Sequence, residues 1–122
     1  MTRQAHLLQL RPDLPTLSME VTPKSIEAFQ NTVLQPILKF QNPLSMSLLK
    51  AHPHFSAHTL DSEKLTRHIN DICKEVRFKN QLIGMMIGLM TLSEFEHYSL
   101  NVKEYNKRIL TMQTARFIDQ LS

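Results

Sequence analysis

Histidines concentrate in one short segment of this chain, where they could bind a metal ion. His52, His54 and His58 belong to the segment His-Pro-His-Phe-Ser-Ala-His. Residues two apart point the same way in an extended segment, so His52 and His54 could share a metal. Imidazole suits zinc, copper and nickel. One hypothesis is therefore a metal-dependent enzyme that uses these three histidines, and the alternative is a surface loop that binds a divalent metal only adventitiously.

A second group of candidate residues lies in the apolar segment 76–90. Polar residues inside a helical apolar stripe, here Lys79 and Asn80, often set register or partner choice. Gly84 and Gly88 are four apart and share a helix face, where each costs about 1 kcal/mol relative to alanine. Close approach of another helix would compensate for this cost. The predicted interface or pocket comprises Lys79, Asn80, Gly84, Met85, Met86, Gly88 and Met90.

Large apolar residues suggest a third kind of site, a small-molecule or lipid pocket between kinked helices. Its lining would be Phe29, Phe40, Met86 and Met90. Flexible methionines can form adaptable binding surfaces, although they more often fill gaps in a core. The pattern names no ligand, and no residue stands out as catalytic.

The turn-forming residues indicate the fold that must position these groups. The chain of 122 residues contains two glycines, and no proline follows Pro53. Sandwiches and barrels need turn residues every 8–12 positions, so this composition argues against them. Glycine-rich phosphate-binding motifs are also absent from the sequence. We predict an all-α protein, a compact bundle of four or five helices.

The first half of the chain divides into an arm and a kinked helix. Residues 1–21 show no sustained periodicity and are expected to form an extended N-terminal arm, with a single helical domain over 22–122. Thr22 and Pro23 are a helix-start pattern, and an apolar stripe then continues to about residue 51. Pro36 and Pro43 interrupt this stripe, so we expect a kinked helix or two helices end to end.

The second half of the chain is marked by helix caps. Asp61 or Ser62 is expected to begin a helix whose heptad stripe reaches residue 90, and whose later part is apolar nearly all round. That change places its end at the centre of the bundle. Thr91 and Glu94 form a capping-box pattern for a short helix over 92–99. Asn101 is then expected to cap a last helix that ends near residue 120.

Charge and cysteine content limit the possible partners and compartment. The net charge of +3 is divided evenly, +2 over residues 1–60 and +1 over 61–122. Nucleic-acid binders instead show a polarised basic region, so no nucleic-acid partner is expected. Cys73 is the single cysteine, which excludes an internal disulfide and favours a reducing compartment. No apolar run is long enough for a secretory signal or a membrane span, and we expect a cytoplasmic protein without a bound cofactor.

Three segments together resemble a known family. Leu34-Gln-Pro-Ile-Leu-Lys-Phe-Gln-Asn42, the run from Val76 to Gly88 and Tyr105-Asn-Lys-Arg-Ile-Leu110 are similar to a family of short bacterial helical proteins of uncharacterised function, some labelled "glyoxalase". The resemblance spans about residues 25–120 and implies that Pro36 belongs to a Pro-Ile-Leu-Lys motif. Pro43 and the histidine segment depart from the pattern. The family supplies no catalytic residues.

The glyoxalase label does not fit these residues. Enzymes of the first glyoxalase type use repeated strand-rich modules, and this sequence has no run of alternating strands. The second type needs the metal motif THxHxDH, whereas HPHFSAH lacks its aspartate. The leading hypothesis is instead a non-enzymatic interaction or regulatory module that self-associates as a homodimer, because the segment 78–90 offers more apolar surface than a small monomer readily covers.

Overall fold

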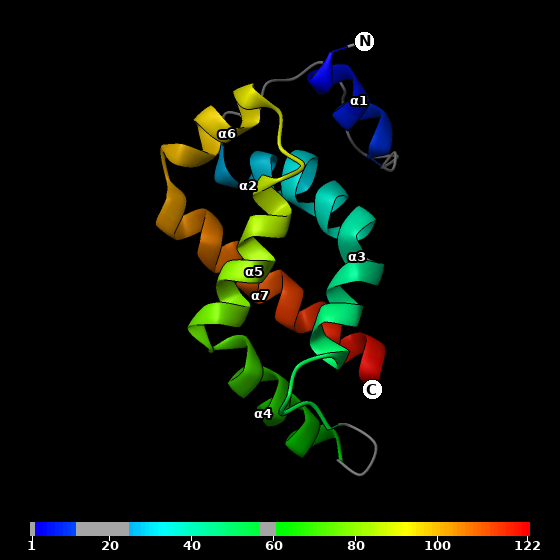
Figure 1. Ribbon diagram of the computed structural model, residues 1–122. Coiled ribbons are helices and arrows are strands. Elements are labelled where there is room, and N and C mark those ends of the chain that lie inside the picture. Colours follow the sequence, from blue (N-terminus) through cyan, green and yellow to red (C-terminus); the bar gives the residue numbers. More distant parts are fainter. Residues whose placement is uncertain (1, 12–24, 57–60) are drawn as a thin grey trace.

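The computed structural model describes residues 2–11, 25–56 and 61–122, and all regular secondary structure in those ranges is helical (Figure 1). The all-α prediction is therefore confirmed. Because α2, η1 and α3 follow one another without a break, the described ranges contain six separate helical rods, slightly more than predicted. The elements are α1 (Arg3–Leu10), α2 (Ile26–Phe29), the π-helical η1 (Gln30–Leu34), α3 (Gln35–Lys50), α4 (Ser62–Cys73), α5 (Val76–Ile87), α6 (Leu92–Ser99) and α7 (Val102–Leu121).

The first long rod contains the expected irregularity, and it lies at Pro36. The π-helical η1 ends two residues before this proline, and the Gln35 backbone N–H bonds to the carbonyl of Gln30, five residues earlier. Proline cannot donate a backbone hydrogen bond, and a π-bulge is one of the ways in which a helix adapts. The helix then continues through Pro43. Ser25 caps its start, whereas the predicted cap at Thr22 and Pro23 lies outside the described residues.

The stripe predicted as one helix up to residue 90 is divided into α4 and α5, so that prediction was wrong. α4 ends at Cys73, and Glu75 has an extended backbone with ψ of 131°. No glycine or proline marks this break. The apolar stripe passes through it because both helices turn their apolar faces towards α7, and a heptad pattern follows the buried face rather than the continuity of the backbone.

The helix caps of the second half of the chain were largely predicted. Asp61 accepts a hydrogen bond from the backbone of Lys64, and Thr91 and Glu94 make both bonds of a capping box. Asn101 occupies the N-cap position of α7, although its side chain makes no capping bond. Side-chain capping bonds thus fix the starts of α4 and α6.

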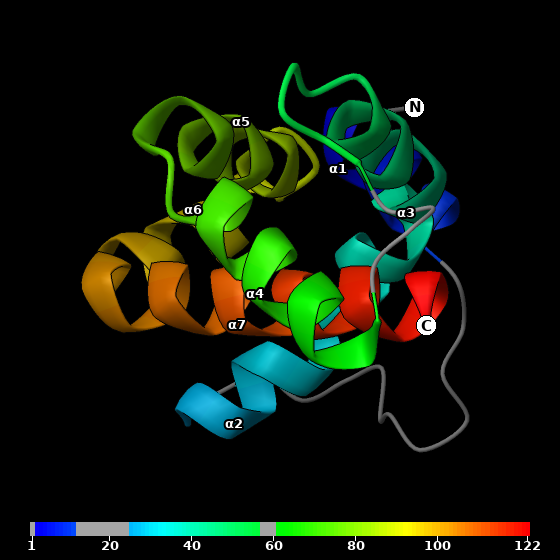
Figure 2. The ribbon, with the colours of Figure 1, turned by 90° about the horizontal axis from the view of Figure 1, so that it is seen from below.

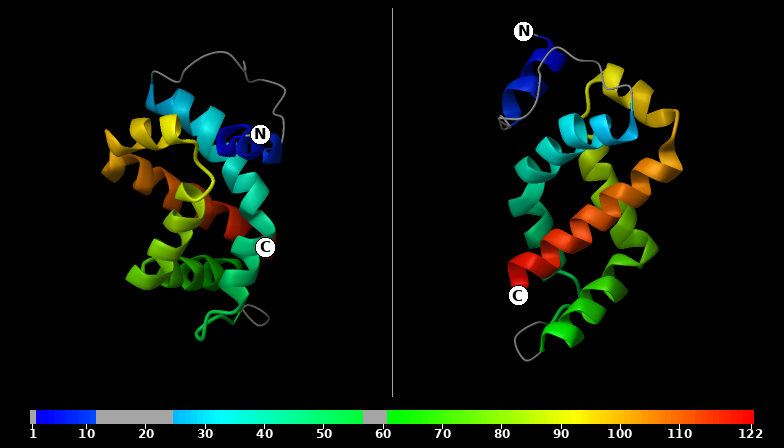
Figure 3. Two further views of the ribbon diagram at one scale, coloured as in Figure 1. Left: turned by 45° about the horizontal axis from the view of Figure 1, so that its top comes forward. Right: turned by 180° about the vertical axis from the view of Figure 1, so that it is seen from behind.

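The central element is α7, not the end of the segment 76–90 as predicted. In Figure 2, α3 and α5 lie on one side of α7 and α2 lies on the other, and Figure 3 shows α7 running diagonally from the α6 end to the C-terminus. Tyr105 and Ile109 belong to a core cluster with residues of η1, α3, α5 and α6. Phe117 belongs to a second cluster, with residues of α3, α4 and α5. One helix therefore joins both cores.

The N-terminal arm is helical where the structure describes it, which corrects the prediction of an extended segment. α1 spans Arg3–Leu10, and Thr2 caps it by accepting a hydrogen bond from Ala5. Only Leu7 of this helix is buried. The arm residues from 12 to 21 lie outside the described ranges.

None of the helices in the described ranges has the length and hydropathy that a membrane crossing requires.

Gln113 of α7 is a buried residue whose substitution is expected to stabilise the fold. Its side chain is 2% exposed, and its Nε2 is buried without a hydrogen-bond partner. A buried, unsatisfied polar group costs about 1–3 kcal/mol. Gln113→Met, which keeps the length of the side chain, is therefore expected to raise the free energy of unfolding by about 1–2 kcal/mol in urea titrations. Gln4→Met, at an exposed position of α1, should change it by less than about 0.5 kcal/mol, and an equal or destabilising effect at Gln113 would contradict this account.

Candidate functional site

The outward face of α5 contains the two glycines, and this chain does not cover them. Gly84 and Gly88 are both exposed, as is Asn80 one turn before. A Cβ atom added to Gly84 would meet nothing within 4 Å. One added to Gly88 would meet the carbonyl oxygen of Gly84, in its own helix, at 3.3 Å. Among the described residues, no other helix of this chain approaches these glycines closely.

The other predicted interface residues lie on different sides of α5. Met86 and Met90 are buried in the first core cluster. Met85 is half-buried, and its carbonyl accepts a hydrogen bond of 3.1 Å from Gln41 Nε2 of α3. Lys79 is half-buried and lines a groove against α4 and α7. The structure therefore does not bring the seven predicted residues together on one surface.

The residues predicted to line a pocket between kinked helices do not share a cavity. Phe29, Met86 and Met90 pack together in the first core cluster, each no more than 2% exposed. Phe40 lies on the surface of α3. The three core residues thus hold α2, α5 and the connection after α5 against η1 and α3.

The histidine segment is tied to the start of α5. His52 Nδ1 accepts a hydrogen bond of 3.1 Å from the backbone N–H of His54, and its Nε2 lies 3.1 Å from Glu75 Oε1. The ring also packs edge-on against Phe78, with centroids 5.6 Å apart. With Arg77, these side chains line a groove of about 310 Å³. This arrangement gives His52 a complete structural role.

These contacts bear on the metal hypothesis. A histidine nitrogen that binds a metal needs a free lone pair. The Nδ1 lone pair of His52 is directed at a backbone N–H, and Nε2 acts as the donor to Glu75 in that tautomer. The described residues contain no group of three histidine, cysteine or acidic side chains arranged to hold a metal. His58, the third predicted ligand, lies outside the described residues.

Two arginines that the sequence analysis did not single out bind the C-terminal end of α5. Arg3 donates to the carbonyl of Met90 at 2.9 Å and to that of Gly88 at 3.3 Å. Arg11 donates to the carbonyl of Leu89 at 2.8 Å and makes a two-pronged ion pair with Glu94. These carbonyls belong to the connection that follows α5, and the guanidinium groups supply them with hydrogen-bond donors.

The sequence predicts only one partner in this arginine site. The capping box identifies Glu94, but nothing nearby pairs it with an arginine 83 residues earlier. The site is also where the polar contacts of α1 with the rest of the molecule concentrate. It acts as a structural clamp on the junction between α5 and α6.

An aromatic cluster around His97 is likewise structural. The His97 ring stacks on Phe29 with centroids 4.7 Å apart, and its Nε2 lies 2.8 Å from the Tyr105 hydroxyl. The Tyr98 hydroxyl donates to Asn106. Burial raises the pKa of both tyrosine hydroxyls, so they stay protonated near neutral pH. His97 Nε2 and the two tyrosine hydroxyls therefore have partners within the cluster, which gives them a structural role.

No protein family, curated protein or solved structure matches this chain. The resemblance to short bacterial helical proteins therefore stays a prediction. Three features of the described residues bear on function. They are the uncovered face of α5, the histidine segment whose His52 is held by hydrogen bonds, and the groove that Lys79 lines.

Proposed function

We propose that this protein is a non-enzymatic interaction module that forms a homodimer through the outward face of α5. We define this face by its exposed residues Arg77, Asn80, Gln81, Gly84 and Gly88. The observation that carries the proposal is the position of Gly84, at the centre of the face with nothing within 4 Å of a built Cβ. The proposal includes a reducing, cytoplasmic compartment, which the free thiol of Cys73 supports.

The fold of the monomer gives no reason for glycine at residue 84. A glycine inside a helix costs about 1 kcal/mol relative to alanine, and here an alanine methyl group would fit without a clash. The backbone conformation does not require glycine, since neither glycine has a positive φ. Glycine is useful where a second backbone comes close, and a second copy of the chain would supply that backbone.

The α5 face has a shape that fits a copy of itself. Its N-terminal half carries the long polar side chains Arg77, Asn80 and Gln81, and its C-terminal half is the shallow surface of Gly84 and Gly88. In an antiparallel pair, the long side chains of each copy lie over the glycines of the other. Such two-fold contacts are reciprocal, as a closed dimer requires.

Gly84→Ala tests the proposal because its two expected effects have opposite signs. The folded monomer should gain about 1 kcal/mol in free energy of unfolding, since alanine favours the helix and meets no atom. Dimerisation should weaken by about tenfold or more, because over-packing a close contact costs about 1–3 kcal/mol. Urea unfolding at high dilution measures the first effect, and light scattering across a concentration series measures the second.

Larger substitutions provide the matched control. Gly84→Arg should give a folded monomer, whereas Ser47→Arg, at an exposed position of α3, should leave the dimer intact. Circular dichroism would verify folding of both variants. If Gly84→Ala and Gly84→Arg dimerised as tightly as the unmodified protein, the α5 face would not be the interface.

A further inference from the structure

A groove on the other side of α5 has the composition of a ligand site. It lies where α4 ends and α5 begins, over the middle of α7, and has a volume of about 410 Å³. Lys79, which lines it, lies five residues before Gly84 and hence about 140° around the helix from it. The groove is therefore independent of the proposed dimer face. Ligand pockets in proteins commonly measure about 300–1,000 Å³, which includes this volume.

The floor of the groove is apolar. Leu110 and Ile118 of α7 line it and also pack against the second core cluster. Cys73 lines it from the end of α4, and burial raises the pKa of its thiol, so the group stays neutral. These two α7 residues are separated by about 12 Å at the helical rise of 1.5 Å per residue. The floor is long enough for a medium-length alkyl chain.

The groove is positively charged at its rim. Lys74 and Lys79 line it, and no carboxylate does. Neither lysine makes an ion pair with the described residues. An apolar floor with two lysines at its edge is complementary to a molecule that has an apolar body and one anionic end. A neutral lipid would leave the lysines unused, and an inorganic anion would leave the floor exposed to water.

We propose that this groove binds an alkyl carboxylate, with the alkyl chain on Leu110 and Ile118 and the carboxylate at Lys74 and Lys79. The lysine ammonium groups donate hydrogen bonds to the carboxylate, which are stronger than bonds between neutral groups. The length of the ligand's alkyl chain sets the affinity, because a longer alkyl chain buries more apolar area. Binding involves no covalent chemistry.

Calorimetric titration with hexanoate, octanoate and decanoate, all below their micelle concentrations, tests the proposal. Affinity should rise by about two- to fourfold for each added methylene group, since burial of one methylene contributes a corresponding free energy. Decanol should bind at least about tenfold more weakly than decanoate, because it lacks the charge that the lysines recognise. Acetate should show no heat of binding.

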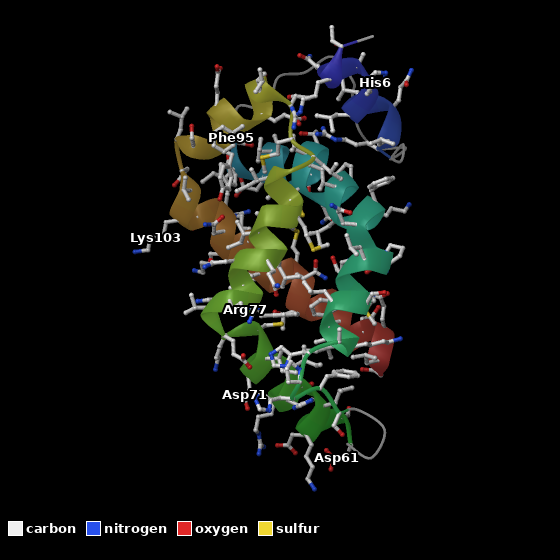
Figure 4. The ribbon with its side chains drawn as sticks, viewed as in Figure 1. His6, Asp61, Asp71, Arg77, Phe95 and Lys103 are labelled. Carbon is white, nitrogen blue, oxygen red and sulfur yellow. The ribbon has the colours of Figure 1, made fainter. Side chains whose placement is uncertain are left out.

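Lysine variants locate the site. Lys79→Gln should weaken decanoate binding by about tenfold, and Lys74→Gln by a similar factor. Lys103→Gln is the matched control, because Lys103 is an exposed lysine of α7 that points away from the molecule (Figure 4). The proposal would be overturned by decanol binding as tightly as decanoate, by equal affinities in the three variants, or by no binding at millimolar decanoate.

Discussion

Phe117→Ala is expected to lower the free energy of unfolding by about 3–5 kcal/mol, the cost of truncating a fully buried phenylalanine. The side chain is 0% exposed and lies in the cluster where α7 meets α3, α4 and α5. It also pairs with Phe78, with ring centroids 6.3 Å apart. Truncation would therefore open a cavity where these four helices meet. Urea unfolding followed by circular dichroism would measure the change.

Phe95→Ala is the matched control, because the same atoms are removed from a side chain that is 43% exposed on α6 (Figure 4). Its cost should stay below about 1.5 kcal/mol. Phe117→Leu, which leaves a smaller cavity, covers the case in which the alanine variant does not fold, and it should cost about 1–2 kcal/mol. Equal costs at residues 95 and 117 would contradict the central position of α7.

Glu94→Ala is expected to lower the free energy of unfolding by about 2–3 kcal/mol. The carboxylate accepts the Thr91 backbone N–H in the capping box and also binds Arg11. The Arg11 side chain is 9% exposed, so loss of its partner would leave a largely buried guanidinium without a counter-charge. The arm would then separate from the body, and amide hydrogen exchange in α1 should accelerate.

The neighbouring Glu96 provides a control for charge and helix position. It lies on the same helix, is exposed and makes no ion pair with the described residues. Glu96→Ala should change stability by less than about 0.5 kcal/mol and leave the exchange of α1 amides unchanged. If the two variants behaved alike, the clamp formed by Glu94 and the arginines would contribute nothing to docking of the arm.

Features that depend on local hydrogen bonding were predictable from the sequence. The caps at Asp61 and Thr91 were predictable because each side chain accepts a hydrogen bond from the backbone amide three residues later. The irregularity at Pro36 followed from its missing N–H. In contrast, the break at Lys74 and Glu75 has no local cause, because tertiary packing of two helices on α7 determines it. Periodicity reports which face is buried and is insensitive to such a break.

The candidate sites were only partly predictable for the same reason. Helical spacing placed Gly84 and Gly88 on one face, but whether another element of the chain covers that face depends on the whole fold. Lys79 was selected for its polarity within an apolar stripe, and the structure places it beside a groove whose other walls lie on α4 and α7. The pairing of Arg11 with Glu94 joins segments that are 83 residues apart, and no local pattern in the sequence predicts such a contact.

Sedimentation velocity of the unmodified protein across a micromolar concentration series tests the proposed dimer most directly. We predict a reversible equilibrium towards a species of twice the chain mass of 14.2 kDa, shifted back to the monomer by Gly84→Arg. A single species of 14.2 kDa at every concentration would contradict the proposal.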